Sequence, residues 1–478
     1  MLVVFLVLAL AGTLRLFNIG WSFSNNGIDE GIMVERSLMV SRGYVPYTDL
    51  PLDQAPLAFY LGALFDGSLL DLRIVTAAAS LVAIASCMYL ARRLRNTPAM
   101  IMTGLLLAVD FALLRESRTF SLDGLSSTFL AISLLPFSIY SKSGGRTMLV
   151  VSGALIGLST ATKLLGGLGL IGMLLFLLVQ ARVDKSFKRR IVDMAILLTT
   201  AAIPLAIFLV ALGPHEMLTG MILDQGQRGF VPELKLSILG YLALNAAYLL
   251  PMVYARRMWS LGPEAKFLLI TSGVILVFMI FQPLTFFHHL VLLSPPLAVL
   301  GGICLSDLMF GKKARDGPLG THLIPRRSYA TFVVICAVAV AGIIVSAGFA
   351  AYGLARQGEP FQEHFASVVE EHSSQSDWVV SGDPLIAAMA DRMTPPGLVN
   401  IAFRIHPDIS EESVESAIIA YNVKVVVVCY RLNEMAGLST FLLAHGYDQI
   451  EDDFRVVEPV MNLFEDPVGP VTVFVRSD

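Results

Sequence analysis

Charged residues are scarce in this chain of 478 residues: Asp, Glu, Lys and Arg make up 15% of it, against 55% for hydrophobic residues. A soluble globular domain carries about 25% charged residues, so this chain has too few to cover a surface that faces water. The scarcity excludes a soluble enzyme, a disordered chain and a disulfide-rich secreted domain. Cysteine is also rare, and the four cysteines form no pair that indicates a disulfide framework or a metal site.

Two sequence patterns are missing as well. No Gly-rich phosphate loop occurs, which argues against ATP or a soluble nucleotide sugar as a substrate. No internal repeat is visible, which disfavours transporters built from inverted repeats. The charges that remain are unevenly divided: residues 1–355 hold 27 Lys and Arg against 18 Asp and Glu, whereas residues 356–478 hold 7 against 20. This division predicts a membrane body, residues 1–355, followed by an acidic domain in water, residues 356–478.

Long apolar runs dominate the predicted membrane body. A helix needs about 20 apolar residues to cross the hydrocarbon core of a bilayer, and continuous runs of this kind exclude a transmembrane β-barrel. The runs predict about eleven transmembrane helices, near residues 1–17, 73–91, 98–114, 121–140, 148–162, 164–180, 191–212, 236–254, 266–283, 287–308 and 329–352. A cleaved signal peptide at residues 1–17 is disfavoured, because no basic residue precedes the apolar run.

Lys and Arg set the predicted orientation, because cytoplasmic loops carry an excess of basic residues. The loops after the even-numbered spans hold 18 of them, whereas the alternate loops hold about seven. The N-terminus is therefore predicted to lie in the cytoplasm and residues 356–478 outside. Within this outer part, residues 377–381, 423–429 and 471–475 predict buried strands and residues 411–420 a helix. We therefore expect a polytopic α-helical membrane protein with a C-terminal extracytoplasmic α/β domain.

Ionisable residues near the ends of membrane helices are costly and usually functional, and here they gather on the predicted outer side. The first outer loop, about residues 18–72, holds Asp29, Glu30, Tyr44 and Asp49. The other outer loops hold Arg115, Glu116, Arg118, Asp123, Lys163, His288 and His289. A carboxylate such as Asp29 could accept the proton of an attacking hydroxyl, and Arg and Lys could stabilise the charge on a departing phosphate. These residue types favour group transfer from a phosphate-activated lipid.

Several motifs resemble the GT-C class of membrane glycosyltransferases, which includes protein O-mannosyltransferases and lipid A aminoarabinose transferases. The residues that carry the resemblance are Arg15–Asn18, Asp29–Gly31, Gly43–Asp49 with Pro56, Ser117 and Arg118 with Asp123, Gly157–Lys163 and His289–Pro296. Each motif alone is weak, and it is their order and topology over about residues 1–310 that make the resemblance specific. One departure is Gln54-Ala55-Pro56, where relatives often have a Lys just before the Pro.

The resemblance implies a GT-C-like fold, a polyprenyl-phosphate-linked sugar donor, and inverting transfer of the sugar to an acceptor hydroxyl outside the cytoplasm. It implies that Asp29 is the catalytic base, with Glu30 beside it for contact with the acceptor or a metal ion. The residues predicted for the donor phosphate are Arg118, Lys163 and Arg115. The supporting residues are Asp123, His289, His288, Tyr44 and Asp49. A divalent metal ion stays open as a cofactor, bound by Asp29 and Glu30 if at all.

The predicted partners are the lipid-linked donor, membrane lipids and a protein, lipid or glycan acceptor, without nucleic acid. A transporter or lipid flippase is the alternative, and Pro204 and the glycines of residues 166–172 are the hints of it. A non-catalytic scaffold that presents residues 356–478 would leave the charges of residues 115–123 without a role. The transferase is favoured because the acidic and basic groups gather at one predicted membrane face.

Overall fold

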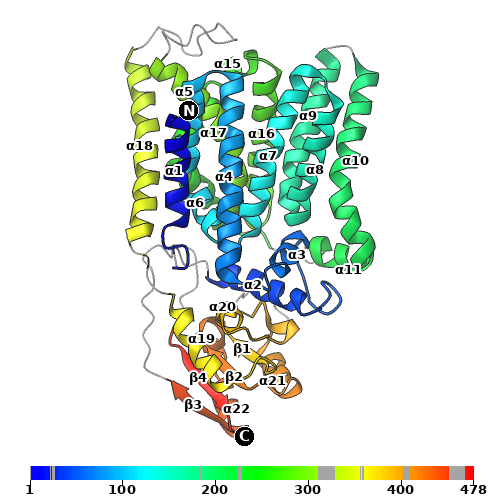
Figure 1. The fold of residues 1–478 in the computed structure, drawn as a ribbon, viewed down its shortest axis with the longest axis vertical. Helices are drawn as coiled ribbons and strands as arrows, with labels where there is room; N and C mark the ends of the chain where they lie inside the picture. The colour runs from blue at the N-terminus through cyan, green and yellow to red at the C-terminus, as the bar shows by residue number, and fades with distance from the viewer. Residues whose placement is uncertain are drawn as a thin grey trace.

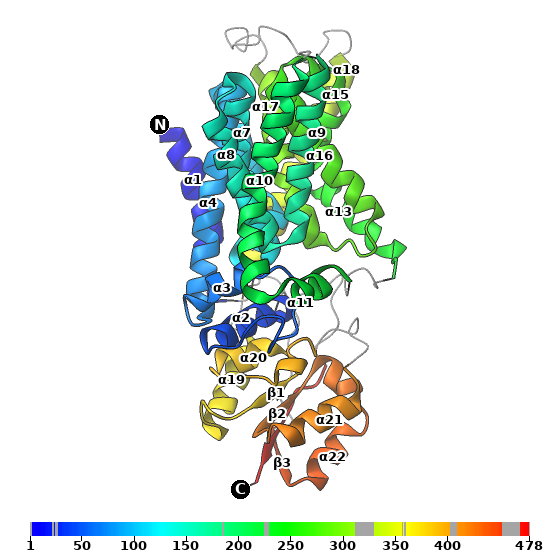
Figure 2. The same cartoon turned by 90° about the vertical axis from the view of Figure 1, so that its right-hand side faces the viewer.

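The computed structural model describes residues 2–21, 23, 27–183, 186–223, 229–310, 329–355, 357, 360–401, 409–451 and 469–477. A bundle of apolar helices forms one end of the molecule, and a small sheet with its own helices forms the other (Figure 1). Helix α2 (Gly27–Ser41) lies between these two parts (Figure 2). We call the described part of residues 360–477 the C-terminal sheet unit.

Eleven apolar segments make up the bundle within the described ranges. Seven are helices long enough to cross a membrane: Leu69–Leu94 (α4), Leu122–Ser143 (α7), Leu164–Val183 (η1 and α9), Phe187–Leu212 (α10), Pro263–Phe281 (α16), Phe287–Phe310 (η5 and α17) and Ala337–Ala355 (within α18, Tyr329–Ala355). Two are bent pairs: Thr97–Val109 (α5) with Phe111–Arg118 (α6), and Pro232–Leu244 (η3 and α13) with Ala246–Val253 (η4 and α14). Two are shorter: Leu2–Leu16 (α1) and Arg146–Thr162 (α8).

These segments coincide one by one with the predicted spans. Seven of them, or nine when each bent pair counts as one span, are long and apolar enough by themselves to cross a bilayer, as judged over the described residues. The prediction of a multi-pass helical membrane protein is confirmed. Short helices fill the segments between spans: α2, α3 (Leu57–Ala63), α11 (Pro214–Leu218), η2 (Thr219–Leu223) and α15 (Ala255–Ser260). The predicted first outer loop therefore contains two helices, α2 and α3.

A polar network replaces helical hydrogen bonds where α5 and α6 meet at an angle of 61°. Asp110 ends α5 and caps α6, because its carboxylate accepts a hydrogen bond from the N–H of Leu113 at 3.1 Å. Arg15, fully buried in α1, donates to the carbonyl oxygens of Leu107 and Ala108 at 3.1 and 3.4 Å. The last carbonyls of a helix lack partners within it, so this arginine stabilises the bend inside the bundle.

The C-terminal sheet unit has four strands in the spatial order β1 (Val379–Ser381), β2 (Val425–Val428), β4 (Thr472–Arg476) and β3 (Tyr447–Glu451). β1 and β2 are parallel, and β4 is antiparallel to both of its neighbours. Its helices are α19 (Phe361–His372), α20 (Pro384–Met389), α21 (Glu411–Ala420) and α22 (Leu438–Ala444), with 3-10 turns η7 (Pro396–Leu398) and η8 (Tyr430–Glu434). The three predicted strands and the predicted helix are confirmed. The edge strand β3 was not predicted, because its sequence is largely polar and contains no apolar run.

The predicted orientation can be tested by cysteine labelling. Cys87, Cys304 and Cys429 are buried, so these three give little background. We expect a membrane-impermeant maleimide to label Glu412→Cys, which is exposed on α21, in intact cells. Lys142→Cys, exposed near the end of α7, is expected to react only after the membrane is opened. Labelling of Lys142→Cys in intact cells would show that the predicted orientation is wrong. The basic residues at 311–328, Lys185 and Arg228, on which the orientation partly depends, lie outside the described residues.

Candidate functional site

Four of the predicted site residues come together at the end of the bundle that carries α2. Asp29 lies in the first turn of α2, and its side chain is about half exposed (49%). His288, in η5, lies between two carboxylates: its Nδ1 is 3.9 Å from Oδ2 of Asp29, and its Nε2 is 3.9 Å from Oδ2 of Asp123. Asp123 in turn forms an ion pair with Lys163, whose Nζ is 2.6 Å from the same Oδ2. We call these four side chains the Asp29 cluster.

Local structure aims these side chains toward one another. Ser121 caps α7 by accepting a hydrogen bond from the N–H of Gly124 at 3.2 Å, so that Asp123 lies in the first turn of that helix. A helix N-terminus stabilises negative charge, and Asp29 occupies the same position in α2. Lys163 follows α8 in an extended conformation, before η1 begins. Its ammonium group therefore leaves the helix and reaches Asp123.

Arg115 and Glu116 add a second pair of charges at the end of α6. Nε of Arg115 is 3.8 Å from Oε1 of Glu116, and both side chains are largely buried. The hydroxyl of Ser121 donates a hydrogen bond to Oε2 of Glu116. Ser121 is also the residue that caps the turn of α7 in which Asp123 lies. The dense charged segment between the third and fourth spans therefore adjoins the Asp29 cluster, as its position in the sequence indicated.

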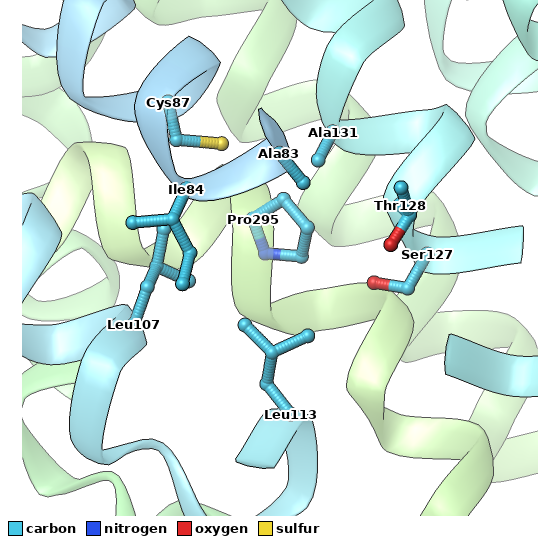
Figure 3. A pocket seen from close by; sticks show the side chains of 9 residues that line it. All are labelled: Ala83, Ile84, Cys87, Leu107, Leu113, Ser127, Thr128, Ala131 and Pro295. Carbon is cyan, nitrogen blue, oxygen red and sulfur yellow. The ribbon is translucent and has the colours of Figure 1, made fainter. Parts of the chain in front are cut away.

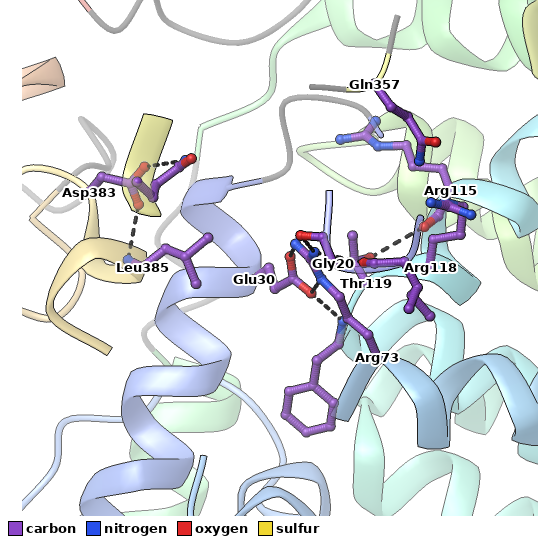
Figure 4. A network of polar contacts seen from close by, with 12 residues as sticks. Gly20, Glu30, Arg73, Arg115, Arg118, Thr119, Gln357, Asp383 and Leu385 are labelled. Carbon is purple, nitrogen blue, oxygen red and sulfur yellow. Dashed lines mark hydrogen bonds and ion pairs between the residues drawn. The ribbon is translucent and has the colours of Figure 1, made fainter. Parts of the chain in front are cut away.

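Glu30 is buried, and both of its carboxylate oxygens accept hydrogen bonds. They accept from Nε and Nη2 of Arg73 at 2.8 and 2.6 Å, and Oε1 also accepts from the N–H of Phe120 at 2.8 Å (Figure 4). Arg73 donates as well to the carbonyl oxygens of Ile19 and Gly20 at 3.0 Å. These contacts favour a structural role for Glu30 over contact with an acceptor or a metal ion. Sequence reasoning missed Arg73, although an arginine at the end of a span is a signal for such a pair.

Arg118 caps the C-terminal end of α1. Its Nη1 donates to the carbonyl oxygens of Leu14 and Arg15 at 2.8 and 2.9 Å, and its Nη2 to those of Phe17 and Asn18 at 2.9 and 3.2 Å. Leu14 and Arg15 lie in the last turn of α1, where carbonyl groups lack partners within the helix, and Phe17 and Asn18 directly follow that helix. Four such bonds engage both terminal nitrogens of the guanidinium group, so they favour a structural role over contact with a donor phosphate.

Tyr44 and Asp49, two of the predicted supporting residues, make contacts away from the Asp29 cluster. The ring of Tyr44 packs edge-on against Trp378 of the C-terminal sheet unit, with centroids 6.4 Å apart. Asp49 accepts a hydrogen bond from the N–H of Val45 at 2.8 Å, within its own turn. Neither contact points to chemistry.

One group of side chains has the composition of a metal site. Asp123, His288 and His289 offer ligand atoms within 4.8 Å of one another, and one carboxylate with two imidazoles suits a transition metal. However, Lys163 already holds one oxygen of Asp123, and Nδ1 of His289 lies 3.0 Å from the side-chain amide of Gln282. A metal ion would therefore bind the second oxygen of Asp123, which is buried and has no hydrogen-bond partner among the described residues. The predicted pair of Asp29 and Glu30 fits a metal ion less well, because both oxygens of Glu30 already accept hydrogen bonds from Arg73.

The neighbouring carboxylates of Asp29 and Glu30 allow a matched test of these assignments. Removing one partner of a buried ion pair costs about 3 kcal/mol or more, so we expect Glu30→Gln to lower the free energy of unfolding by about 3 kcal/mol. Asp29→Asn, at a half-exposed position, is expected to change it by less than about 0.5 kcal/mol. Thermal or denaturant unfolding of the purified protein in detergent measures both. Equal stability of the two variants would contradict the structural role of Glu30.

Comparison with known proteins agrees with this fold. Residues 53–212 match the family model of dolichyl-phosphate-mannose-protein mannosyltransferases. No curated protein sequence matches significantly. The crystal structure of ArnT from Cupriavidus metallidurans in the apo state is similar over 98% of this chain and 97% of that one, with a TM-score of 0.67 and 16% identity. The crystal structure of the same ArnT bound to undecaprenyl phosphate is similar over 99% of this chain and 97% of that one, with a TM-score of 0.64 and 16% identity.

A third structure shares the architecture. The oligosaccharyltransferase from Archaeoglobus fulgidus in the apo form matches over 98% of this chain and 75% of that one, with a TM-score of 0.58 and 14% identity. At these identities the structures establish the fold, and the family match covers about a third of the chain. By this fold and this match, the chain resembles the GT-C membrane glycosyltransferases, as its motifs indicated.

Proposed function

We propose that this protein is a GT-C membrane glycosyltransferase that moves a sugar from a polyprenyl-phosphate-linked donor to an acceptor hydroxyl, with inversion at the anomeric carbon. The observation that carries the proposal is the position of Asp29. It is a half-exposed carboxylate at a helix N-terminus, 3.9 Å from His288 and at the end of the membrane bundle. The ArnT structure that contains undecaprenyl phosphate supports a lipid-linked donor. We propose that this site faces away from the cytoplasm.

In the proposed reaction the acceptor oxygen attacks the anomeric carbon, and the bond from that carbon to the phosphate oxygen breaks. Asp29 accepts the proton of the acceptor hydroxyl as general base. The bonding electrons leave with the lipid phosphate, which gains negative charge. Cations placed where charge develops lower the barrier, and Lys163 and Arg115 are the cations that we assign to this phosphate. Asp123 holds Lys163 in place, and His288 connects Asp123 to Asp29.

The structure gives little support to the transporter alternative. Helix α10 contains Pro204 and lies at the outside of the bundle. Only 17% of the residues in its most apolar stretch are buried. Gly169 and Gly172 serve close helix packing, because a Cβ atom there would lie 2.5 Å from Leu130 and 2.6 Å from Thr271. The pocket in Figure 3 lies among α4–α7 and α17, and no charged side chain lines it. None of these features forms a charged path between the two ends of the bundle.

Sugar transfer by the purified protein tests the proposed function. The assay uses radiolabelled polyprenyl-phosphate hexose as donor and a membrane extract as the source of acceptor. We expect Asp29→Asn to lower kcat by at least about 100-fold, which is the usual range for a lost general base. The matched control is Asp71→Asn, an exposed aspartate in the first turn of α4, which should change kcat less than about twofold. Full transfer by Asp29→Asn would remove this residue from the chemistry, and failure of the wild-type protein to bind any polyprenyl phosphate would overturn the function.

Removal of divalent metal ions provides a separate prediction. Because the ammonium of Lys163 already provides a positive charge 2.6 Å from Asp123, we expect EDTA to lower the rate of transfer less than about twofold. The same assay with EDTA, and then with added Mn²⁺ or Zn²⁺, measures the effect. Loss of transfer that Mn²⁺ or Zn²⁺ restores would contradict this prediction. It would assign the ion to Asp123, His288 and His289.

A further inference from the structure

Helix α2, which carries Asp29, is enclosed to an unusual extent for a helix outside the membrane spans. Every residue from Glu30 to Met39 is buried, including the charged side chains of Glu30, Glu35 and Arg36. A helix of 15 residues is marginal in water without packing. The bundle covers one side of α2, and the C-terminal sheet unit covers the other (Figures 1 and 2). The position of Asp29 therefore depends on both parts.

The backbones of α2 and the C-terminal sheet unit lie close together at Gly31, two residues after Asp29. A Cβ atom at Gly31 would lie 2.4 Å from the backbone nitrogen of Leu385 and 2.9 Å from its Cα. Leu385 belongs to α20, and its side chain points toward α2 (Figure 4). Asp383 caps α20 and accepts a hydrogen bond from the N–H of Leu385 at 3.0 Å. The start of α20 is thereby fixed directly against the turn that carries Asp29.

Polar contacts continue along the middle of α2. The N–H of Thr394 donates to Oε1 of Glu35 at 2.6 Å, and burial raises the pKa of Glu35 to about 8. Its Oε2 is buried without a hydrogen-bond partner among the described residues. At the next residue of α2, Nη2 of Arg36 donates to the side-chain oxygen of Asn400 at 3.1 Å. Both contacts join α2 to the segment that follows α20.

A third set of contacts holds the C-terminal end of α2. Nη2 of Arg42 donates to the carboxylate of Asp391 at 2.5 Å and to its carbonyl oxygen at 3.2 Å. Just after the end of α2, Tyr44 packs against Trp378, which directly precedes β1. The C-terminal sheet unit thus contacts α2 from the first turn to the last.

We propose that the C-terminal sheet unit is a positioning element for Asp29: by docking along α2, it holds the carboxylate against His288 in the geometry that transfer requires. The proposal rests on the proposed function and assigns that unit a role in it. Leu385, Thr394 and Asp391 are positioning residues, because they act through α2 and touch no reacting atom. A misplacement of about 1 Å can cost 100-fold in rate. Loosening the contact between α2 and the C-terminal sheet unit should therefore lower kcat strongly and change the KM for the donor little.

Gly31→Ala tests the proposal as a wedge between α2 and α20. Alanine favours a helix more than glycine does, so the substitution leaves α2 itself intact and acts at the contact with Leu385. We expect amide hydrogen exchange in α2 to accelerate at least about tenfold. We expect kcat to fall at least about tenfold and KM for the donor to change less than about threefold. The matched control is Gly273→Ala in α16, where an added Cβ meets no atom within 4 Å, and both measurements should stay at wild-type values.

A charge swap at the other end of α2 provides a second, milder test. Arg42→Asp and Asp391→Arg should each accelerate exchange in α2 and lower kcat, and the double variant should restore both to within about twofold. Unchanged exchange in Gly31→Ala and in both single swaps would overturn the docking. Faster exchange with unchanged kcat would overturn the positioning. Absence of transfer by the wild-type protein would instead overturn the proposed function, and the exchange data would still decide whether the C-terminal sheet unit holds α2.

Discussion

The buried ion pair between Glu30 and Arg73 is the interaction on which the arrangement of the site depends. A desolvated carboxylate is tolerated only when its oxygens are paired, and here Arg73 and the N–H of Phe120 pair them. The same arginine engages two carbonyl oxygens just after α1. One contact therefore joins the ends of α1, α2 and α4 and the segment before α7. Because α7 carries Asp123 in its first turn, the pair also fixes the distance between the two halves of the Asp29 cluster.

Two adjacent carboxylates on α2 have opposite environments, and helix geometry explains why. Consecutive residues of an α-helix point about 100° apart, so Glu30 faces α4 whereas Asp29 remains half exposed beside His288. A buried carboxylate that is held by an arginine and a backbone N–H is out of reach of a substrate hydroxyl, and an isolated exposed one has no fixed geometry. The chain separates these requirements: Glu30 anchors the helix, and in the proposed reaction Asp29 accepts the proton.

The sequence was sufficient for the elements of the fold and for the identity of most charged residues in the site, because long apolar runs and ordered motifs are local signals. The sequence could not show which of these side chains contact one another or the backbone. Glu30 pairs with Arg73, and Arg118 with carbonyl groups at the end of α1, across long separations that no periodicity encodes. The burial of α2 was also beyond prediction, since it requires the docked C-terminal sheet unit. Asp29, Asp123, Lys163 and His288 were singled out one by one from their positions in predicted outer loops, and only the folded chain shows that they adjoin.

Charge balance explains why the Asp29 cluster contains more than a base and a cation. An unpaired ammonium group at the edge of a membrane is costly to desolvate, and Asp123 offsets this cost for Lys163. In the proposed reaction the donor brings further negative charge, which Lys163 alone, already paired, cannot neutralise. Arg115 is the second cation that balances this charge, and Glu116 holds it in place. Each cation assigned to the phosphate therefore has its own carboxylate, which keeps it fixed and ready before the donor enters.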